Sequence, residues 1–199
     1  MIKLFLCVFL SLMIVKCGSP KTAPKTTPKV ITEPKEEIVT QTNTTPTIPD
    51  RAITGEFVED EANFYAYVKS VDTSKGRTVI DFELGFCDHS IILEECYGAE
   101  LEILRFPEFT TELLLIKTKL KDPVFTKYFL YQHKNNNWQL VVNGFSIHQD
   151  NMDNVPQPIH VDPNNKANML RYYSVFDLDT STESGYTWKL LQESIPILE

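Results

Sequence analysis

The sequence predicts an antiparallel all-β domain over residues 50–199, a sandwich or barrel of roughly eight to ten strands. Several segments alternate apolar and polar residues with the period of two that is typical of half-buried strands. Two pairs of β-prone runs flank turn-prone segments, and no window of ten residues combines a 3.6-residue period with helix caps. Residues 50–199 also contain 20 aromatic residues, enough apolar surface for the core of one domain.

The clearest strand is predicted over residues 78–86, TVIDFELGF. Alternation divides its side chains into an apolar and an acidic face, with Ile80, Phe82, Leu84 and Phe86 opposite Asp81 and Glu83. Shorter alternating segments predict further strands over residues 100–103 and 114–120. We expect each of these strands to bury one face.

Two hairpins are predicted in the second half of the domain. Residues 128–142 contain two β-prone runs on either side of Lys-Asn-Asn-Asn at 134–137, a composition that favours a tight turn. Residues 170–191 repeat this arrangement around Asp-Thr-Ser-Thr-Glu-Ser-Gly at 179–185. The two hairpins therefore supply four of the expected strands.

The N-terminal segment, MIKLFLCVFLSLMIVKCGSP, has the pattern of a secretory signal. Lys3 precedes twelve apolar or small residues, Leu4 to Val15, fewer than the roughly 20 that a membrane-spanning helix needs. Lys16 and Cys17 follow the run, without an Ala-x-Ala cleavage site, and a cysteine at this place resembles the signal peptides of bacterial lipoproteins. The resemblance implies loss of residues 1–16 and diacylation of Cys17. The alternatives are a secreted protein with an ordinary signal and a protein anchored by an uncleaved one.

Lipid attachment at Cys17 would make a membrane surface the first partner of the chain, since two acyl chains give stable anchoring. The expected location is a bacterial membrane, in the first place the outer membrane, with the domain facing the periplasm or the cell surface. Between the anchor and the domain, residues 18–49 contain six prolines, nine threonines and no aromatic residue. Such a composition predicts that residues 17–49 form a disordered tether.

The charge of the domain argues against nucleic acid as a partner. Residues 50–199 carry 13 basic and 24 acidic side chains, a net charge of −11. A surface of this sign repels phosphate backbones, and no basic stripe interleaved with aromatic residues occurs in the sequence. An envelope protein or a glycan is the expected partner of the domain.

Cys87 and Cys96 are the two cysteines of the domain, and an even pair in an exported protein predicts a disulfide. The bridge would close a loop of ten residues, counted from Cys87 to Cys96. Two buried thiols, or a thiol that binds metal, are the alternatives. The spacing matches no familiar zinc motif.

A pattern of Ile-His-x-Asp occurs twice, twelve residues apart, in the long polar segment between the two hairpins. If both copies were short strands that pair, two imidazoles and two carboxylates would converge, from His148, Asp150, His160 and Asp162. A mixed nitrogen and oxygen site of this kind suits zinc, manganese or iron. The alternative is turn chemistry without a ligand, in which case no cofactor is expected.

No catalytic motif with a nucleophile, a metal-binding helix or a phosphate-binding glycine loop occurs in the sequence. The domain is rich in tyrosine and tryptophan, whose amphipathic rings can bind a protein or a sugar or can pack in a core. We therefore expect a lipid-anchored envelope protein whose domain is a non-enzymatic binding or assembly module. A metal-dependent hydrolase using the His/Asp residues and a passive structural lipoprotein are the alternatives.

Overall fold

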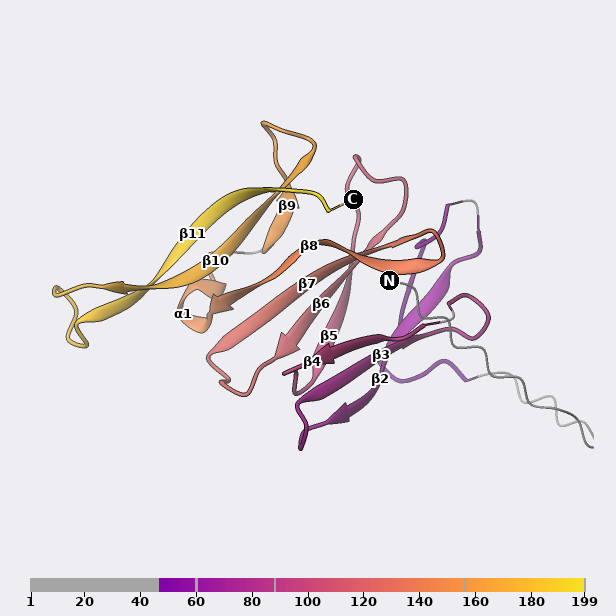
Figure 1. Cartoon of the computed structure of the whole chain (residues 1–199), viewed down its shortest axis with the longest axis horizontal. Helices are drawn as coiled ribbons and strands as arrows, with labels where there is room; N and C mark the ends of the chain where they lie inside the picture. Colours follow the sequence, from indigo (N-terminus) through magenta and orange to yellow (C-terminus); the bar gives the residue numbers. More distant parts are fainter. Residues whose placement is uncertain (1–46, 60, 88, 156, 199) are drawn as a thin grey trace, which may run out of the picture. The chain divides into compact units, whose positions relative to one another are not determined.

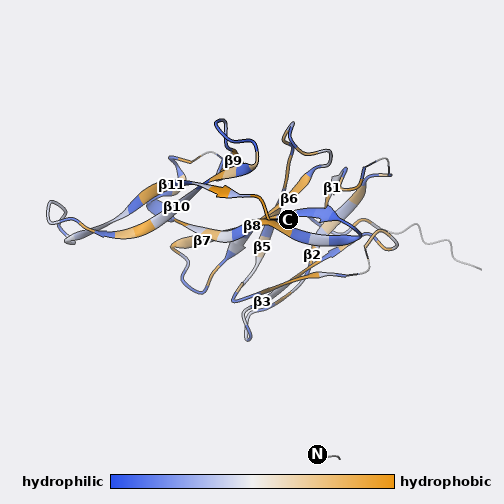
Figure 2. Ribbon diagram, turned by 45° about the horizontal axis from the view of Figure 1, so that its top comes forward, coloured by the Kyte–Doolittle hydropathy of each residue, from blue (hydrophilic) through white to orange (hydrophobic). Residues whose placement is uncertain are grey.

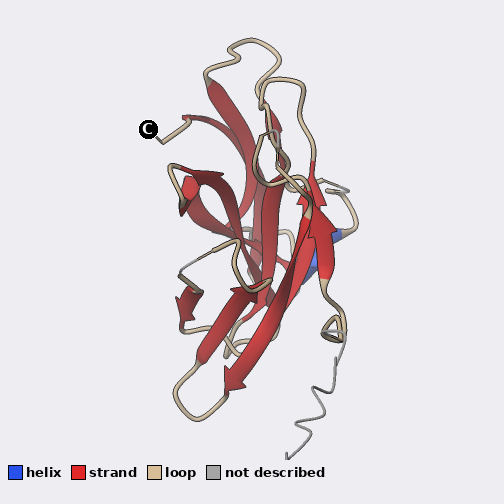
Figure 3. Ribbon diagram, turned by 90° about the vertical axis from the view of Figure 1, so that its right-hand side faces the viewer, coloured by secondary structure: helices blue, strands red, loops and turns tan. Residues whose placement is uncertain are grey.

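The computed structural model describes residues 47–59, 61–87, 89–155 and 157–198, all of which belong to one compact unit, Thr44–Glu199. Most of these residues lie in strands, and the helix among them is one turn, α1 (Gln149–Met152) (Figure 3). The prediction of an antiparallel all-β fold is therefore confirmed. The signal segment, Cys17 and the tether up to residue 46 lie outside the described residues. Within those ranges, no helix has the length and apolar character needed to cross a membrane.

Eleven strands of the described residues form three antiparallel sheets (Figure 1). Sheet A has the order β1-β2-β3-β4 and consists of β1 (Ile53–Gly55), β2 (Phe64–Asp72), β3 (Arg77–Phe82) and β4 (Ile91–Glu94). Sheet B has the order β5-β6-β7-β8 and consists of β5 (Ala99–Leu104), β6 (Leu113–Lys119), β7 (Phe125–Lys134) and β8 (Asn137–His148). Sheet C has the order β11-β10-β9 and consists of β9 (Ile159–Val161), β10 (Asn168–Leu178) and β11 (Tyr186–Pro196).

Sheet B separates two hydrophobic cores. Its strand β6 is buried on both faces: Leu113 and Leu115 pack in the core shared with sheet C, whereas Leu114 and Ile116 pack in the core shared with sheet A. The sequence had predicted a half-buried strand at this position. Side chains alternate between the faces of a strand, so β6 needs apolar residues at successive positions to serve two cores.

Both predicted hairpins are confirmed. In the first, Asn135 and Asn136 connect β7 to β8 with φ of 53° and 60°, the left-handed backbone that a two-residue hairpin loop favours and asparagine tolerates. In the second, β10 and β11 pair over eleven positions, from Asn168 opposite Pro196 to Leu178 opposite Tyr186. Hydrophobic and hydrophilic residues alternate along these strands (Figure 2).

The strand predicted over 78–86 is shorter than expected, because β3 ends at Phe82. Gly85, with φ of 94°, lies in the following turn, and Leu84 is 97% exposed. Ile80 and Phe82 are buried as predicted, and Phe86 packs against Phe64 with ring centroids 5.0 Å apart. The alternation therefore identified the strand correctly but placed its end too late.

Candidate functional site

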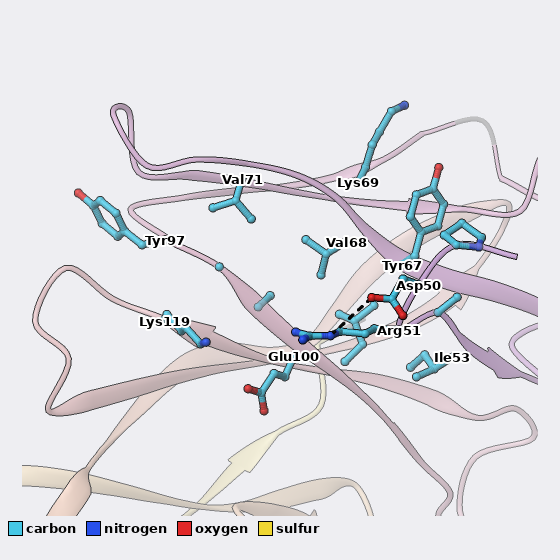
Figure 4. Close-up of a pocket in the computed structure, with 15 residues that line it drawn as sticks. Asp50, Arg51, Ile53, Tyr67, Val68, Lys69, Val71, Tyr97, Glu100 and Lys119 are labelled. Carbon is cyan, nitrogen blue, oxygen red and sulfur yellow. Dashed lines mark ion pairs between the residues drawn. The ribbon is translucent and has the colours of Figure 1, made fainter.

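A groove of about 940 Å³ lies between the N-terminal part of sheet A and the β5 edge of sheet B (Figure 4). Three segments form its walls: residues 49–53, which lead into β1, the second half of β2, and residues 97–101 at the start of β5. Half-buried apolar side chains from β2 and β5 face the groove, among them Val68 and Leu101. Two tyrosines, Tyr67 and Tyr97, belong to the lining as well.

One wall of the groove is a part of the β2 edge that no described strand pairs with. β1 is only three residues long and pairs with Phe64, Tyr65 and Ala66, so β2 continues beyond it. Tyr65 accepts a hydrogen bond from Glu83 on the β3 side, and the backbone groups of successive residues alternate in direction. Val68 therefore directs its N–H and C=O toward the groove. A bulge between Val68 and Ser70 shifts this alternation by one residue, so the N–H and C=O of Val71 also point toward the groove.

The opposite wall is the free edge of β5. Lys119 donates a hydrogen bond to Gly98 and accepts one from Tyr97, so its backbone faces β5. Continued along the β5–β6 register, this alternation directs Glu100 toward β6 and leaves Ala99 and Leu101 facing away from it. Among the described residues no strand pairs with this edge. The groove is therefore bounded on both sides by strand edges that no described strand pairs with, the feature that natural sheets usually cover or charge.

Arg51 extends into the groove from the segment before β1. Pro49 accepts a hydrogen bond from the backbone of Ala52 at 3.2 Å, and Arg51 sits in this turn with φ of 57°. A non-glycine residue rarely adopts this backbone region. The Arg51 side chain is 90% exposed and reaches toward Glu100 across the groove (Figure 4). Its Nε lies 3.9 Å from Oδ2 of Asp50. The strained turn thus presents a guanidinium group in the centre of the groove.

Lys69 and Tyr67 are held on the outer side of β2 by Asp81 of β3. The Lys69 Nζ donates to Asp81 at 2.6 Å, and this hydrogen bond raises the pKa of Lys69. The pKa of Tyr67 is raised by burial and by the nearby Asp81 carboxylate. Burial alone would raise the pKa of Asp81, but hydrogen bonds from Lys69 and Ser90 outweigh it and lower this pKa. Lys69 therefore forms an ion pair with Asp81, whereas Lys119, which also lines the groove, forms no ion pair with a described residue.

The composition of the groove suits the binding of a polypeptide. It offers open backbone donors and acceptors, half-buried valine and leucine side chains, tyrosines, and charged side chains of both signs such as Arg51 and Glu100. These are the elements that recognise an extended polypeptide.

The predicted His/Asp cluster does not form. β9, which carries His160, pairs with β10 and not with β8, which carries His148. The His148 backbone donates to Ser174, whereas His160 lies opposite Leu170; these two β10 residues are four positions, roughly 13 Å, apart. No group of three or more potential metal ligands occurs among the described residues. The premise that the two Ile-His-x-Asp segments pair with one another is therefore wrong.

His148 and Asp150 have local structural roles. The His148 ring is buried, stacks on Trp188 with centroids 5.0 Å apart and packs edge-on against Phe125. Its Nδ1 accepts a hydrogen bond from the Asp150 backbone at 3.3 Å and so caps α1. The Asp150 carboxylate Oδ2 lies 3.3 Å from the same Nδ1, so the structure brings this histidine and this carboxylate of the predicted cluster together, at the N-terminus of α1.

Asp162 and His160 are likewise used by the fold. Asp162 accepts hydrogen bonds from the Asn164 backbone at 2.8 Å and from the Ser194 hydroxyl, closing the connection from β9 to β10. The Ser194 hydrogen bond, followed by that from Asn164, lowers the pKa of Asp162. His160 lies beside the Tyr172 ring, with centroids 6.0 Å apart. Turn chemistry, the alternative interpretation of the motif, describes Asp162 well.

The predicted disulfide between Cys87 and Cys96 is not seen in the structure. Cys96 is buried in the core between sheets A and B, and its Sγ lies 3.3 Å from the Glu94 carbonyl oxygen. Burial raises the pKa of this thiol. Of the alternatives considered from the sequence, a buried thiol describes Cys96.

Comparisons of the chain with protein-family models, with curated proteins and with solved structures found no match. The geometry of the described residues is therefore the basis for a functional proposal. Sequence reasoning had not identified the groove, because its defining features are a short β1 and a bulge in β2. Neither the end of pairing at Ile53 nor the register shift after Val68 has a distinct residue pattern.

Proposed function

We propose that the protein is a lipid-anchored component of a bacterial cell envelope whose domain binds an extended segment of another envelope protein. The segment would lie in the groove between β2 and β5 as an added strand. The observation that carries this proposal is the presence of two open strand edges on facing walls, at Val68 and Val71 and at Ala99 and Leu101. Main-chain hydrogen bonds to such an edge supply affinity independent of side-chain identity.

Side chains in the groove would select the bound segment. In an added strand, alternate side chains point to opposite faces, so one set would meet the apolar wall that includes Val68 and Leu101. The other set would pass Arg51, whose ion pair with Asp50 is long at 3.9 Å and fully exposed, and Lys119, which makes no ion pair with a described residue. We therefore infer a preference for apolar residues at every second position, with an acidic residue between them.

The anchor is the second part of the proposal and is supported by the resemblance of residues 1–20 to lipoprotein signals. Diacylation at Cys17 would keep the groove within reach of other envelope proteins through the tether. Metabolic labelling with an alkyne fatty acid checks this part: the full chain should become labelled, and Cys17→Ser should abolish the label. Persistent labelling of Cys17→Ser would contradict the assignment of the anchor.

A peptide selection tests the groove. Decapeptides displayed on phage are selected against the full-length chain in detergent, and the peptides obtained are then measured by fluorescence anisotropy. Val71→Pro should weaken their binding at least tenfold, because proline removes the N–H that β2 directs into the groove. Ile92→Pro is the matched control, since Ile92 is an exposed β-branched residue on the outer edge strand of the same sheet.

Methylated peptides give an independent readout. N-methylation of alternate amides in a selected peptide should abolish binding, because an added strand donates these N–H groups to the sheet edge. Scrambled peptides with the same composition should bind weakly. Equal binding to Val71→Pro and to the unaltered chain, or insensitivity of every selected peptide to backbone methylation, would refute strand addition at this groove.

A further inference from the structure

Among the described residues, three buried polar side-chain atoms have no hydrogen-bond partner. They are Thr111 Oγ1, His133 Nε2 and Trp138 Nε1. His133 lies directly opposite Trp138 in the β7–β8 hairpin, and their ring centroids are 5.3 Å apart. A buried polar group that lacks a partner destabilises the fold. Because Thr111 and His133 also line one pocket, their unpaired atoms call for a partner from outside the chain.

Elsewhere in the described residues, buried polar side chains have partners. Thr78 bonds the Cys96 carbonyl, Thr118 bonds the Lys127 carbonyl, and Asn151 bonds both Ser174 and the Trp188 carbonyl. The fold thus satisfies isolated buried hydroxyl and amide groups where no pocket adjoins them. The unpaired polar atoms near His133 are therefore a local feature and do not reflect poor hydrogen bonding throughout the core.

A pocket of about 590 Å³ is lined by two of these residues, Thr111 and His133. Thr111 is only 6% exposed, so it lies at the base of the pocket. The walls come from four separate segments, with polar side chains predominating: Val58, Glu59, Glu61, Phe86, Thr110 and residues 132–136. Phe86 supplies an aromatic ring, one face of which stacks on Phe64.

The chemistry of the lining selects a class of ligand. Anions are disfavoured because the lining carries two carboxylates, Glu59 and Glu61, against one cation, Lys134, in a domain of net charge −11. A metal ion would need ligands that the described residues do not gather here. A fatty or aromatic ligand would leave the amide, carboxylate and hydroxyl groups of the pocket unsatisfied. Hydroxyl groups that both donate and accept match a mixture of threonine, histidine, glutamine, asparagine and carboxylate groups.

We infer that this pocket is a binding site for a neutral saccharide, with Thr111 and His133 as polar contacts and the Phe86 ring as an apolar surface. The site shares no residue with the β2/β5 groove and would bind another class of ligand, so a negative result for one proposal does not affect the other. The short contact between the His133 and Trp138 rings makes the indole N–H a reporter of occupancy.

An NMR titration tests the assignment. The chain has two tryptophans, so the ¹H–¹⁵N spectrum of the full-length protein contains two indole signals, which Trp188→Phe assigns. Glucose, N-acetylglucosamine and its β-1,4-linked trimer are the probes, in a zwitterionic detergent without a sugar headgroup. We expect at least one probe to shift the Trp138 signal with saturation while the Trp188 signal stays in place.

Two comparisons sharpen the test. Thr111→Val removes the buried hydroxyl and should weaken binding at least tenfold without loss of stability, because an unsatisfied hydroxyl is replaced by an isosteric apolar group. Thr73→Val, in an exposed turn, is the matched control and should bind like the unaltered chain. Glucuronate should bind at least tenfold more weakly than glucose, because its carboxylate meets Glu59 and Glu61. No saturable Trp138 shift with any probe, equal binding by Thr111→Val, or equal binding of glucuronate would overturn the inference.

Discussion

Thr78→Val is expected to destabilise the protein strongly although it changes side-chain volume little. Thr78 is fully buried on β3, where its hydroxyl donates to the Cys96 carbonyl at 3.0 Å and accepts from the Gly98 backbone N–H, also at 3.0 Å. These two bonds fix the crossing from β4 to β5, and therefore the start of the β5 wall of the groove. Valine would remove both bonds and leave a carbonyl and an N–H without their hydroxyl partner.

The expected loss follows from those two bonds. Each contributes about 1 kcal/mol net, and stranding the backbone groups adds desolvation, so the free energy of unfolding should fall by about 2–4 kcal/mol. For a domain of this size the thermal midpoint would drop by roughly 5–15 °C. Urea denaturation followed by circular dichroism measures the change, with Thr73→Val as the exposed control. A loss below about 0.5 kcal/mol for Thr78→Val would refute the reasoning, since it would mean that the hydroxyl bonds contribute nothing net.

Three further results are expected. Gly76→Ala should lower the free energy of unfolding by at least about 1 kcal/mol in urea denaturation, because Gly76 has φ of 63° and an added Cβ would lie 2.9 Å from the Tyr97 ring. The pKa of Asp81 is lowered in the folded state, so its carboxylate stabilises the fold above an unfolded carboxyl pKa of about 4, and this stabilisation is lost as pH falls through the folded pKa. The difference in the free energy of unfolding between the unaltered chain and Asp81→Asn should therefore shrink between pH 6 and pH 2.5. Cys96 should react with iodoacetamide at pH 8 far more slowly in the native chain than in urea, as mass spectrometry of the labelled peptide would show, because burial raises its pKa and hides its sulfur.

The parts of the fold that the sequence predicted correctly are those with strong local signals. The Asn135-Asn136 turn works through its own backbone preference, and the alternation at Ile80 and Phe82 reflects burial of one face. Where tertiary context decides, prediction from sequence was less accurate. Leu84 continues the apolar pattern but is exposed, because Gly85 turns the chain before the residue can join the sheet.

Candidate sites were harder to predict, for a physical reason. His148 and His160 share a motif, but pairing partners far along the chain decide whether two short segments meet, and β10 rather than β8 pairs with β9. The groove and the pocket are defined by unsatisfied backbone edges and by buried atoms such as Thr111 Oγ1. Both are properties of arrangement that a residue pattern does not encode.

The position of β6 between two cores has a thermodynamic consequence. Neither core can open without exposing one face of this strand, so the layers on its two sides cannot lose their structure independently. We expect cooperative unfolding of all three sheets in one transition. A ligand that binds next to sheet A would therefore also stabilise the β10–β11 hairpin of sheet C against unfolding, although it makes no contact with that hairpin.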